Sequence, residues 1–326
     1  MGREQRVRVG NSRSAKTPVT SGIPQGSILG PVLFTIFIND LPDNIQVRCK
    51  VFADDTKIYE DSTFNDKIQQ DLYNMQTWTQ CWNLYFNVAK CKIMHIGKKN
   101  EKNDYYMKIE KELQKLEKCT EEKDLGITFD NLLNFNKHIN NVVSKANQML
   151  GIIKRTFDYK NKDILVKLYK SLVRSHLEYG NVIWAPHLKR QSVIIEKVQR
   201  RATRLVPECR NMNYGERLRY LKLYSLKGRR LRGDLIQVFK IFKGIDDIQP
   251  SNILPLSLYE GTRNQTFKLR HRYAKTDIRK YSFSYKVVGD WNSLPDNVKN
   301  AKTLNAFKNA LDSIPKFKEN FFGYDE

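Results

Sequence analysis

The pattern of hydrophobic and polar residues at the start of the chain predicts two short strands, residues 5–9 and 15–20, with regular alternation over residues 6–9. Residues 10–12 between the two segments are Gly, Asn and Ser, types that favour tight turns. A continuous apolar run over residues 32–38 follows, directly after Pro31. The first turn of a helix tolerates proline, and a run that is apolar on every side suits a buried helix. The pattern therefore predicts a hairpin and then a short buried helix.

Two further apolar segments, residues 47–52 and 56–60, lie on either side of Ala53, Asp54 and Asp55. We expect these segments to form a hairpin with acidic residues at its tip. A longer helix is predicted next, because apolar residues recur at intervals of three and four. They are Ile68, Leu72, Met75, Trp78 and Trp82. A strand is predicted over residues 92–96.

From about His138 onward apolar residues recur at helical spacing, which predicts a mainly helical second part. One expected face holds Ile164, Leu165, Leu168, Leu172 and Val173, and another holds Ile194, Val198, Ala202 and Leu205. The charge changes at nearly the same place. The chain has 57 basic and 35 acidic residues. Residues 1–130 contain 19 basic and 18 acidic residues, whereas residues 131–326 contain 38 basic and 17 acidic residues. We therefore predict an α+β protein of two domains, 1–130 and 131–326.

The composition narrows the function class. With 40% hydrophobic and 28% charged residues, the chain has the composition of a folded protein and not of a disordered one. A net charge of +22, concentrated in the second part, indicates an anionic partner such as nucleic acid or a membrane surface. No basic amphipathic helix carries an exposed aromatic face as well, so nucleic acid is the better interpretation.

The cysteines and the uncharged segment at 17–39 are informative about the cellular compartment of the protein. Five scattered cysteines with no Cys-x-x-Cys pair predict neither a disulfide framework nor a zinc ribbon, and they favour a reducing compartment. Glycine and proline interrupt the uncharged segment, which leaves too short an apolar run for a membrane span. We expect an intracellular protein, nuclear or cytoplasmic, with no membrane segment and no secretion signal.

Two short motifs carry the candidate chemistry. In Ser21-Gly22-Ile23-Pro24-Gln25-Gly26-Ser27 two glycines allow the backbone to approach a ligand closely, although a simple turn would have the same composition. In Phe52-Ala53-Asp54-Asp55 two adjacent carboxylates lie between apolar strands, beside a small Ala that leaves room for a ligand. Carboxylates held in a fixed geometry suit Mg²⁺, the cation that phosphoryl transfer uses.

Together these motifs closely resemble the reverse transcriptases of non-LTR, jockey-like retrotransposons. The first, continued by Ile28-Leu29-Gly30-Pro31, is similar to block B of that family's palm, and the second is similar to block C. The resemblance continues in Asn87 to Lys92 (block D) and in Asp124 to Ile127 with His138 (block E). Trp291-Asn292-Ser293-Leu294-Pro295 resembles the end of such elements. The resemblance implies a partial polymerase palm, a helical thumb and a basic carboxyl-terminal extension.

The resemblance also implies roles for individual residues. Asp54 and Asp55 would bind the Mg²⁺ ions of a two-metal site, and Gln25, Gly26 and Ala53 would line the nucleotide and template pocket. The partners would be an RNA template, a DNA primer and deoxynucleoside triphosphates. Lys90 is the candidate that neutralises the departing pyrophosphate, with Lys92 as the alternative.

One family feature is missing from the sequence. The family's third metal ligand is an Asp in block A, on a strand several tens of residues before the glycine loop. Here 20 residues precede Ser21, they contain no Asp, and Glu4 is their single acid. We therefore expect the chain to be a carboxyl-terminal fragment of an RNA-directed DNA polymerase, inactive alone. The alternative is a non-catalytic, cationic nucleic-acid-binding remnant.

The strongest concentration of positive charge lies between Lys189 and Arg232. This segment has 14 Lys or Arg and only three acids, Glu196, Glu208 and Glu216. Arg200, Arg201 and Arg204 are predicted to project from one helix face, opposite its apolar stripe. Together with Arg229 and Arg230 they are the predicted phosphate contacts, against the alternative of an ordinary solvated face.

Overall fold

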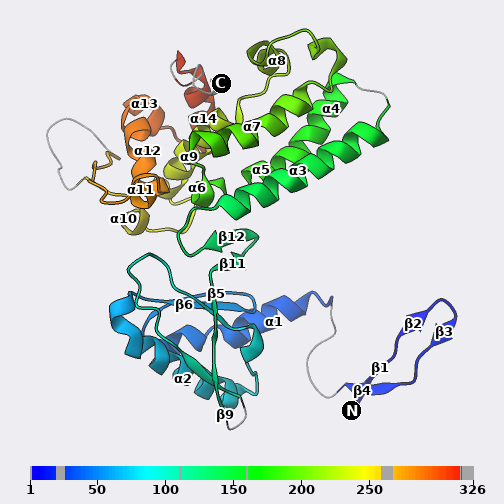
Figure 1. Ribbon diagram of the computed structural model, residues 1–326, viewed down its shortest axis with the longest axis vertical. Helices are drawn as coiled ribbons and strands as arrows, with labels where there is room; N and C mark the ends of the chain where they lie inside the picture. The colour runs from blue at the N-terminus through cyan, green and yellow to red at the C-terminus, as the bar shows by residue number, and fades with distance from the viewer. Residues whose placement is uncertain are drawn as a thin grey trace. The chain divides into compact units, whose positions relative to one another are not determined.

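The computed structural model describes residues 2–19, 26–109, 112–158, 161–257, 267–315 and 317 (Figure 1). The chain divides into two compact units, Met1–Thr120 (unit 1) and Glu121–Glu326 (unit 2). The division lies before the expected boundary at 130/131, because residues 121–130 form a hairpin whose Ile127 is buried in the main apolar cluster of unit 2. No helix in the described parts of the chain is both long enough and apolar enough to cross a membrane.

The described part of unit 1 consists of two-stranded sheets, two α-helices and short helical turns. Its elements are β1 (Arg3–Gln5), β2 (Arg8–Val9), β3 (Ser12–Arg13), β4 (Thr17–Val19), α1 (Leu29–Ile38), η1 (Leu41–Asn44), β5 (Arg48–Phe52), β6 (Asp55–Tyr59), η2 (Ser62–Phe64), α2 (Asn65–Trp82), η3 (Val88–Lys90), β7 (Lys92–Met94), β8 (Tyr106–Ile109), β9 (Glu112–Lys115) and β10 (Glu117–Cys119). Strands β1 and β4, β2 and β3, β5 and β6, and β8 and β9 pair antiparallel, whereas β7 and β10 pair parallel.

The predicted hairpins at the start of the chain and at residues 47–60 are confirmed, the first as two successive strand pairs. The helix predicted from its apolar periodicity is α2, which buries Leu72, Met75 and Trp78. Trp82, expected on the same face, is 46% exposed and packs against Phe37 with the two rings nearly perpendicular, at 75°. The α2 helix therefore provides the main apolar surface on which unit 1 packs.

Helix α1 is formed as predicted, but its expected burial is wrong. Ile38 is buried, and Phe34 and Phe37 pack beside it on the cluster that includes Trp78. The opposite face carries four exposed apolar side chains at the spacing of one helix stripe. They are Leu29 (66% exposed), Val32 (54%), Leu33 (50%) and Ile36 (69%). A sequence that is apolar all round does not ensure that each side of the helix meets a neighbour.

Unit 2 begins with a hairpin and is otherwise helical. Its elements are β11 (Glu121–Asp124), β12 (Ile127–Asp130), α3 (Asn136–Thr156), α4 (Lys162–Leu168), the π-helical turn η4 (Tyr169–Val173), α5 (Arg174–Glu178), α6 (Asn181–Trp184), α7 (Lys189–Thr203), η5 (Pro207–Cys209), α8 (Tyr214–Tyr220), α9 (Leu226–Phe242), α10 (Pro250–Ile253), α11 (Asp277–Lys280), α12 (Phe283–Asn292), α13 (Asp296–Lys299) and α14 (Leu304–Ser313).

The apolar residues of unit 2 form two clusters. One joins β12, α3 and α4 to α8, and the other joins α9, α12 and α14 around Trp291 (Figure 1). The predicted face at 164–173 is only partly right, since Leu165 and Val173 are buried but Ile164 and Leu172 are exposed. The π-helical turn at Tyr169–Val173 interrupts the regular helical spacing on which the prediction for Leu172 rests.

A buried polar network connects α7 to the start of α9. The carboxylate of Glu196 accepts hydrogen bonds from the backbone N–H of Leu226, at 3.0 Å to Oε2, and from the Tyr214 hydroxyl. Gln199 donates to the Tyr224 carbonyl at 3.0 Å and accepts from the Tyr169 hydroxyl at 2.6 Å. Burial raises the pKa of Glu196. These bonds fix the position of α7 relative to the start of α9. They therefore also fix the positions of the backbone segments that carry the basic side chains of both helices.

Candidate functional sites

The two acidic residues of the sequence motif lie at the tip of the β5–β6 hairpin. Phe52 pairs with Asp55, so the turn consists of Ala53 and Asp54 alone. Ala53 has φ 51°, in the left-handed region, which such a two-residue turn requires. Ala53, Asp54 and Asp55 are all exposed. The hairpin thus presents two neighbouring carboxylates to solvent.

The rest of the hairpin is anchored to α2. Val51 and Ile58 pack against the apolar residues beneath them. Gln46 and Val47 lie just before β5. Their backbone N–H groups donate hydrogen bonds, at 2.9 and 2.8 Å, to the buried carboxylate of Asp71 on α2. Because the base of the hairpin is fixed in this way, its acidic tip has a defined position within unit 1.

The acidic tip by itself offers an incomplete cation site. Carboxylate oxygens are the hard ligands that Mg²⁺ prefers, so the chemistry of Asp54 and Asp55 fits this ion. Within the residues that the structure describes, however, no three His, Cys, Asp or Glu side chains come together as a ligand set. Two adjacent carboxylates repel each other and leave most of the coordination shell to water.

The glycine loop is described only at its end. Gln25 and the four residues before it lie outside the described residues. Gly26 has φ 84°, a conformation that favours glycine, and an added Cβ there would meet no atom of the described residues within 4 Å. The Ser27 hydroxyl accepts a hydrogen bond from the Gly30 N–H at 3.1 Å, at the start of α1. The conformation of Gly26, and not crowding, is thus what calls for glycine.

The two lysines of the block D motif, Lys90 and Lys92, are separated by one residue and belong to different elements. Lys90 ends the helical turn η3 and is exposed, while Val88 of the same turn is buried. Lys92 begins β7 and is exposed as well. Lys90 forms no hydrogen bond or ion pair with Asp54 or Asp55, and all three are described residues. The choice between Lys90 and Lys92 stays a prediction.

Three of the predicted nucleic-acid contacts lie at the end of helix α7, Arg200 and Arg201 in its last turn and Arg204 directly after it. Arg201 and Arg204 are exposed, and Arg201 donates a hydrogen bond to the Asn147 side chain at 3.0 Å. Arg200 is half-buried, with its guanidinium 4.9 Å from the centre of the Tyr214 ring. The predicted stripe opposite them is correct at Val198 and Ala202, but Ile195 is buried where Ile194 was expected. The exposed face of α7 therefore centres on Arg201 and Arg204.

The other two predicted contacts lie in a different setting. Arg229 forms a bidentate ion pair with Glu178, in which Nη2 is 2.9 Å from Oε2. Arg230 is 6% exposed and donates a hydrogen bond to the Ser192 hydroxyl at 2.9 Å. The structure thus separates Arg201 and Arg204, which are exposed, from Arg200, Arg229 and Arg230, which lie against other protein groups.

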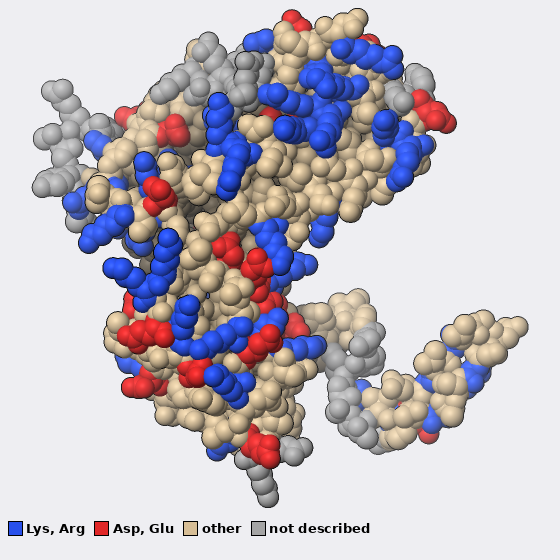
Figure 2. All heavy atoms as spheres, in the orientation of Figure 1, with Lys and Arg blue, Asp and Glu red and all other residues tan. Residues whose placement is uncertain are grey.

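Lys and Arg gather on the face of unit 2 that carries α7 and α8 (Figure 2). One of the three acids counted in this segment, Glu196, is buried and does not lie on that surface. Its burial has a signal in the sequence, because Glu196 falls between Ile195 and Val198 on the buried side of α7. The sequence prediction missed this signal, and the surface is more positive than the residue count indicates.

Comparisons with known proteins complete the description. Residues 4–152 match the family described as reverse transcriptase (RNA-dependent DNA polymerase). The chain is 27% identical over 214 residues to the RNA-directed DNA polymerase from mobile element jockey of Drosophila melanogaster, covering 60% of the chain and 23% of that protein. It is 29% identical to the Drosophila funebris jockey polymerase, over 61% of the chain and 24% of that protein.

A third relative is the probable RNA-directed DNA polymerase from transposon X-element of Drosophila melanogaster, at 26% identity over 64% of the chain and 24% of that protein. The chain thus spans about a quarter of the length of these curated relatives. No solved structure matches the chain.

Proposed function

The chain belongs to the reverse transcriptase family of jockey-like non-LTR retrotransposons, and we propose that it forms the part of an RNA-directed DNA polymerase that carries two metal-binding carboxylates and a grip on nucleic acid. One observation carries this proposal. Asp54 and Asp55 lie together at the exposed tip of an anchored hairpin, inside the matched residues 4–152. The proposed partners are an RNA template, a DNA primer and deoxynucleoside triphosphates.

The proposed role of the hairpin tip is to hold a cation close to the reacting phosphate. Bound Mg²⁺ would stabilise negative charge during phosphoryl transfer and favour deprotonation of the attacking hydroxyl. Asp54 and Asp55 would bind it through oxygens that water already reaches. Gly26, Gln25 and Ala53 would line the nucleotide pocket, and Lys90 or Lys92 would neutralise the departing pyrophosphate.

Helix α1 supports the idea that this site works together with more polypeptide. Its exposed stripe of Leu29, Val32, Leu33 and Ile36 is an apolar surface of the kind that a neighbouring element covers. The curated relatives are about four times as long as the matched region, since it makes up 23–24% of them. We infer that the polymerase segment with the third carboxylate and the fingers packs on this stripe.

A second candidate function is nucleic-acid binding without catalysis. It is favoured by the positive excess after residue 130, 38 basic against 17 acidic residues, and by the exposed Arg201 and Arg204. Such binding would be mainly to phosphates and would have little sequence preference.

The deciding experiment measures primer extension on an RNA template with Mg²⁺ or Mn²⁺. The purified 326-residue chain should extend no primer beyond the level of an Asp54→Ala, Asp55→Ala double variant. Adding the fingers and block A segment of an intact related element should restore synthesis. This activity should fall by more than about 100-fold in Asp54→Asn. Replacing a residue that only hydrogen-bonds to a metal ligand already lowers metal affinity or activity by about 10- to 100-fold, and a ligand itself should matter more.

Asp43→Asn is the matched control, since Asp43 is also an exposed aspartate of unit 1 but lies outside the motif. It should keep full activity. Full activity in Asp54→Asn would show that the assigned metal site is wrong. Template-dependent synthesis by the chain alone, above the double variant, would show that the third carboxylate is not needed or is supplied from within these residues.

A further inference from the structure

The positive excess of unit 1 lies entirely in residues 2–19, which we call the amino-terminal ribbon. The ribbon contains five Lys or Arg and a single acid, Glu4. Residues 20–120 contain 13 Lys or Arg and 13 Asp or Glu, so the rest of unit 1 is neutral on balance. The proposed polymerase chemistry makes no use of this separation of charge.

The amino-terminal ribbon consists of two successive strand pairs. Strand β1 pairs with β4 and β2 pairs with β3, and Gly10, with φ 59°, lies in the two-residue turn between Val9 and Ser12. Residues 2–18 are all exposed, and the exposed fraction of Val9 is 74%. A two-stranded hairpin alone is at best marginally stable in water, so a partner that contacts the ribbon would stabilise it.

Two arginines face each other across β2 and β3. Arg8 lies directly opposite Arg13, so both side chains project from the same face of the ribbon, where like charges repel. Arg8 Nε donates a hydrogen bond to the Gly10 carbonyl at 2.9 Å, whereas Arg13 forms no hydrogen bond or ion pair with another residue that the structure describes. The single acid of the ribbon, Glu4, pairs with Lys16 at 2.7 Å and does not compensate the two arginines.

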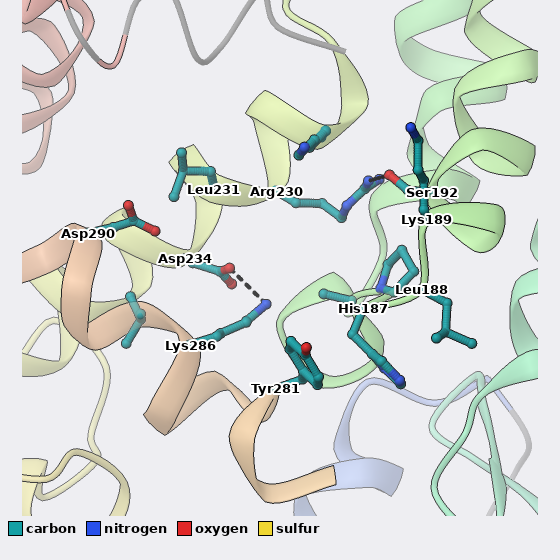
Figure 3. A pocket seen from close by; sticks show the side chains of 14 residues that line it. His187, Leu188, Lys189, Ser192, Arg230, Leu231, Asp234, Tyr281, Lys286 and Asp290 are labelled. Atoms are coloured by element: carbon teal, nitrogen blue, oxygen red, sulfur yellow. Dashed lines mark hydrogen bonds and ion pairs between the residues drawn. The ribbon is translucent and has the colours of Figure 1, made fainter. Parts of the chain in front are cut away.

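The charged side chains around a cavity of unit 2 differ in this respect. This cavity, of about 430 Å³, lies between α7, α9 and α12 (Figure 3). On its wall Asp234 pairs with Lys286 at 2.8 Å, and Arg230 donates a hydrogen bond to the Ser192 hydroxyl at 2.9 Å. These charges have partners within the protein, so the ribbon is the better candidate for an anionic ligand.

The shape of the ribbon indicates which anion it suits. A phosphate between two guanidinium groups relieves their repulsion, because the N–H donors of arginine match the geometry of phosphate oxygens. The major groove of B-form DNA, about 12 Å wide, admits a two-stranded ribbon and has phosphates along both of its walls. The major groove of duplex RNA is too narrow for side chains to read, and a single strand has no groove.

We propose that the amino-terminal ribbon binds duplex DNA in the major groove, with Arg8 and Arg13 in contact with phosphates. The other three cations of the ribbon add to the attraction of the DNA. The inference rests on the proposed nucleic-acid binding of the chain. It adds a contact in unit 1 that does not involve the arginines of α7.

The test measures the affinity of the full 326-residue chain for a fluorescent DNA duplex and for single-stranded RNA of the same length, over a salt series. Arg8→Ala, Arg13→Ala should lower the slope of log affinity against log salt for the duplex by about 0.9 per contact, or about 1.8 in all. The slope for single-stranded RNA should equal that of the parent chain. Amide hydrogen exchange in residues 2–19 should slow when the duplex is added to the parent chain, but not when it is added to the variant.

Two control variants are matched to this change. Arg8→Lys, Arg13→Lys keeps both charges and should keep the slope of the parent chain. Lys98→Ala, Lys99→Ala removes two exposed cations of unit 1 outside the ribbon, and it should keep that slope as well. Unfolding curves of all three variants should match the parent, because every substituted residue is exposed.

The outcomes separate this proposal from the proposed function. A parent-like slope in Arg8→Ala, Arg13→Ala overturns the ribbon as a DNA contact, and an equal loss of slope for duplex and single strand overturns the groove. If Arg201→Ala, Arg204→Ala then still lowers the slope, the nucleic-acid grip of unit 2 stands without the ribbon. If the fingers and block A segment of a related element slows exchange in residues 2–19 but DNA does not, the ribbon binds polypeptide and the proposal is wrong. A parent chain that binds no nucleic acid overturns both.

Discussion

Unit 1 and unit 2 differ in how far each one buries its own apolar residues. In the described residues, the two apolar clusters of unit 1 contain five and four buried side chains, and those of unit 2 contain 20 and 14. Each sheet that the structure describes in unit 1 has two strands, a size that is marginal without further packing. Unit 2 instead packs long helices on one another, with Trp184 and Trp291 fully buried.

This difference has a consequence for function. The proposed metal-binding carboxylates lie in the unit with the smaller core and the exposed α1 stripe, whereas the excess positive charge lies in the unit that packs well. We infer that unit 2 supplies most of the stability and the grip on nucleic acid. On the proposed function, the chemistry of unit 1 would depend on other polypeptide that covers the α1 stripe.

The largest expected effect is on the free energy of unfolding, when a buried side chain of unit 2 is compared with an exposed one of unit 1. Phe239 is 1% exposed and stacks on Phe307 with ring centres 4.3 Å apart, so Phe239→Ala should destabilise the protein by about 3–5 kcal/mol. Leu33→Ala, on the exposed stripe of α1, should change the free energy of unfolding by no more than about 0.5 kcal/mol. Denaturant unfolding measures both. An equally large loss in Leu33→Ala would mean that the stripe is buried in the free chain.

The next effect concerns the positive charge. If Arg201 and Arg204 each contact a phosphate, the Arg201→Ala, Arg204→Ala variant should lower the slope of log affinity against log salt by about 0.7–0.9 per contact. Lys98→Ala, Lys99→Ala is the control, because it removes two exposed cations from unit 1. Affinity measured over a salt series tests this. Equal slopes for variant and parent would reduce the α7 surface to an ordinary solvated face.

The smallest effect concerns pH. Burial, and then the nearby Lys145, lower the pKa of His138, whose Nδ1 accepts a hydrogen bond from the Thr128 N–H at 3.2 Å. The folded protein therefore favours the neutral imidazole. Its stabilisation is complete above the ordinary histidine pKa of about 6.5 and is lost as the pH falls through the lower pKa of the folded state.

Replacing His138 should remove this part of the pH dependence. His138→Gln should flatten the free energy of unfolding between about pH 8 and pH 5, whereas His271→Gln, at an exposed position, should not. An unchanged pH profile in His138→Gln would show that another group causes the dependence.

The sequence by itself determined the local features that short-range chemistry controls. Turn residues flanked by apolar segments predicted the β5–β6 hairpin with Asp54 and Asp55 at its tip, and the recurrence of Leu72, Met75 and Trp78 predicted α2. The motifs on these elements predicted a resemblance to reverse transcriptases, and residues 4–152 match the family of that description. By contrast, β8, β9 and β11 were missed, because charged residues conceal the alternation of strands such as Glu112–Lys115.

Only the tertiary structure decided which side chains are available. The sequence grouped Arg229 and Arg230 with the arginines of α7, but Glu178 and Ser192, which lie 51 and 38 positions away, hold them in place. The exposure of α1 and the burial of Glu196 likewise depend on which elements pack against each helix. Contacts between segments distant in the chain have no local pattern, so the cavity between α7, α9 and α12 could be found only in the folded protein.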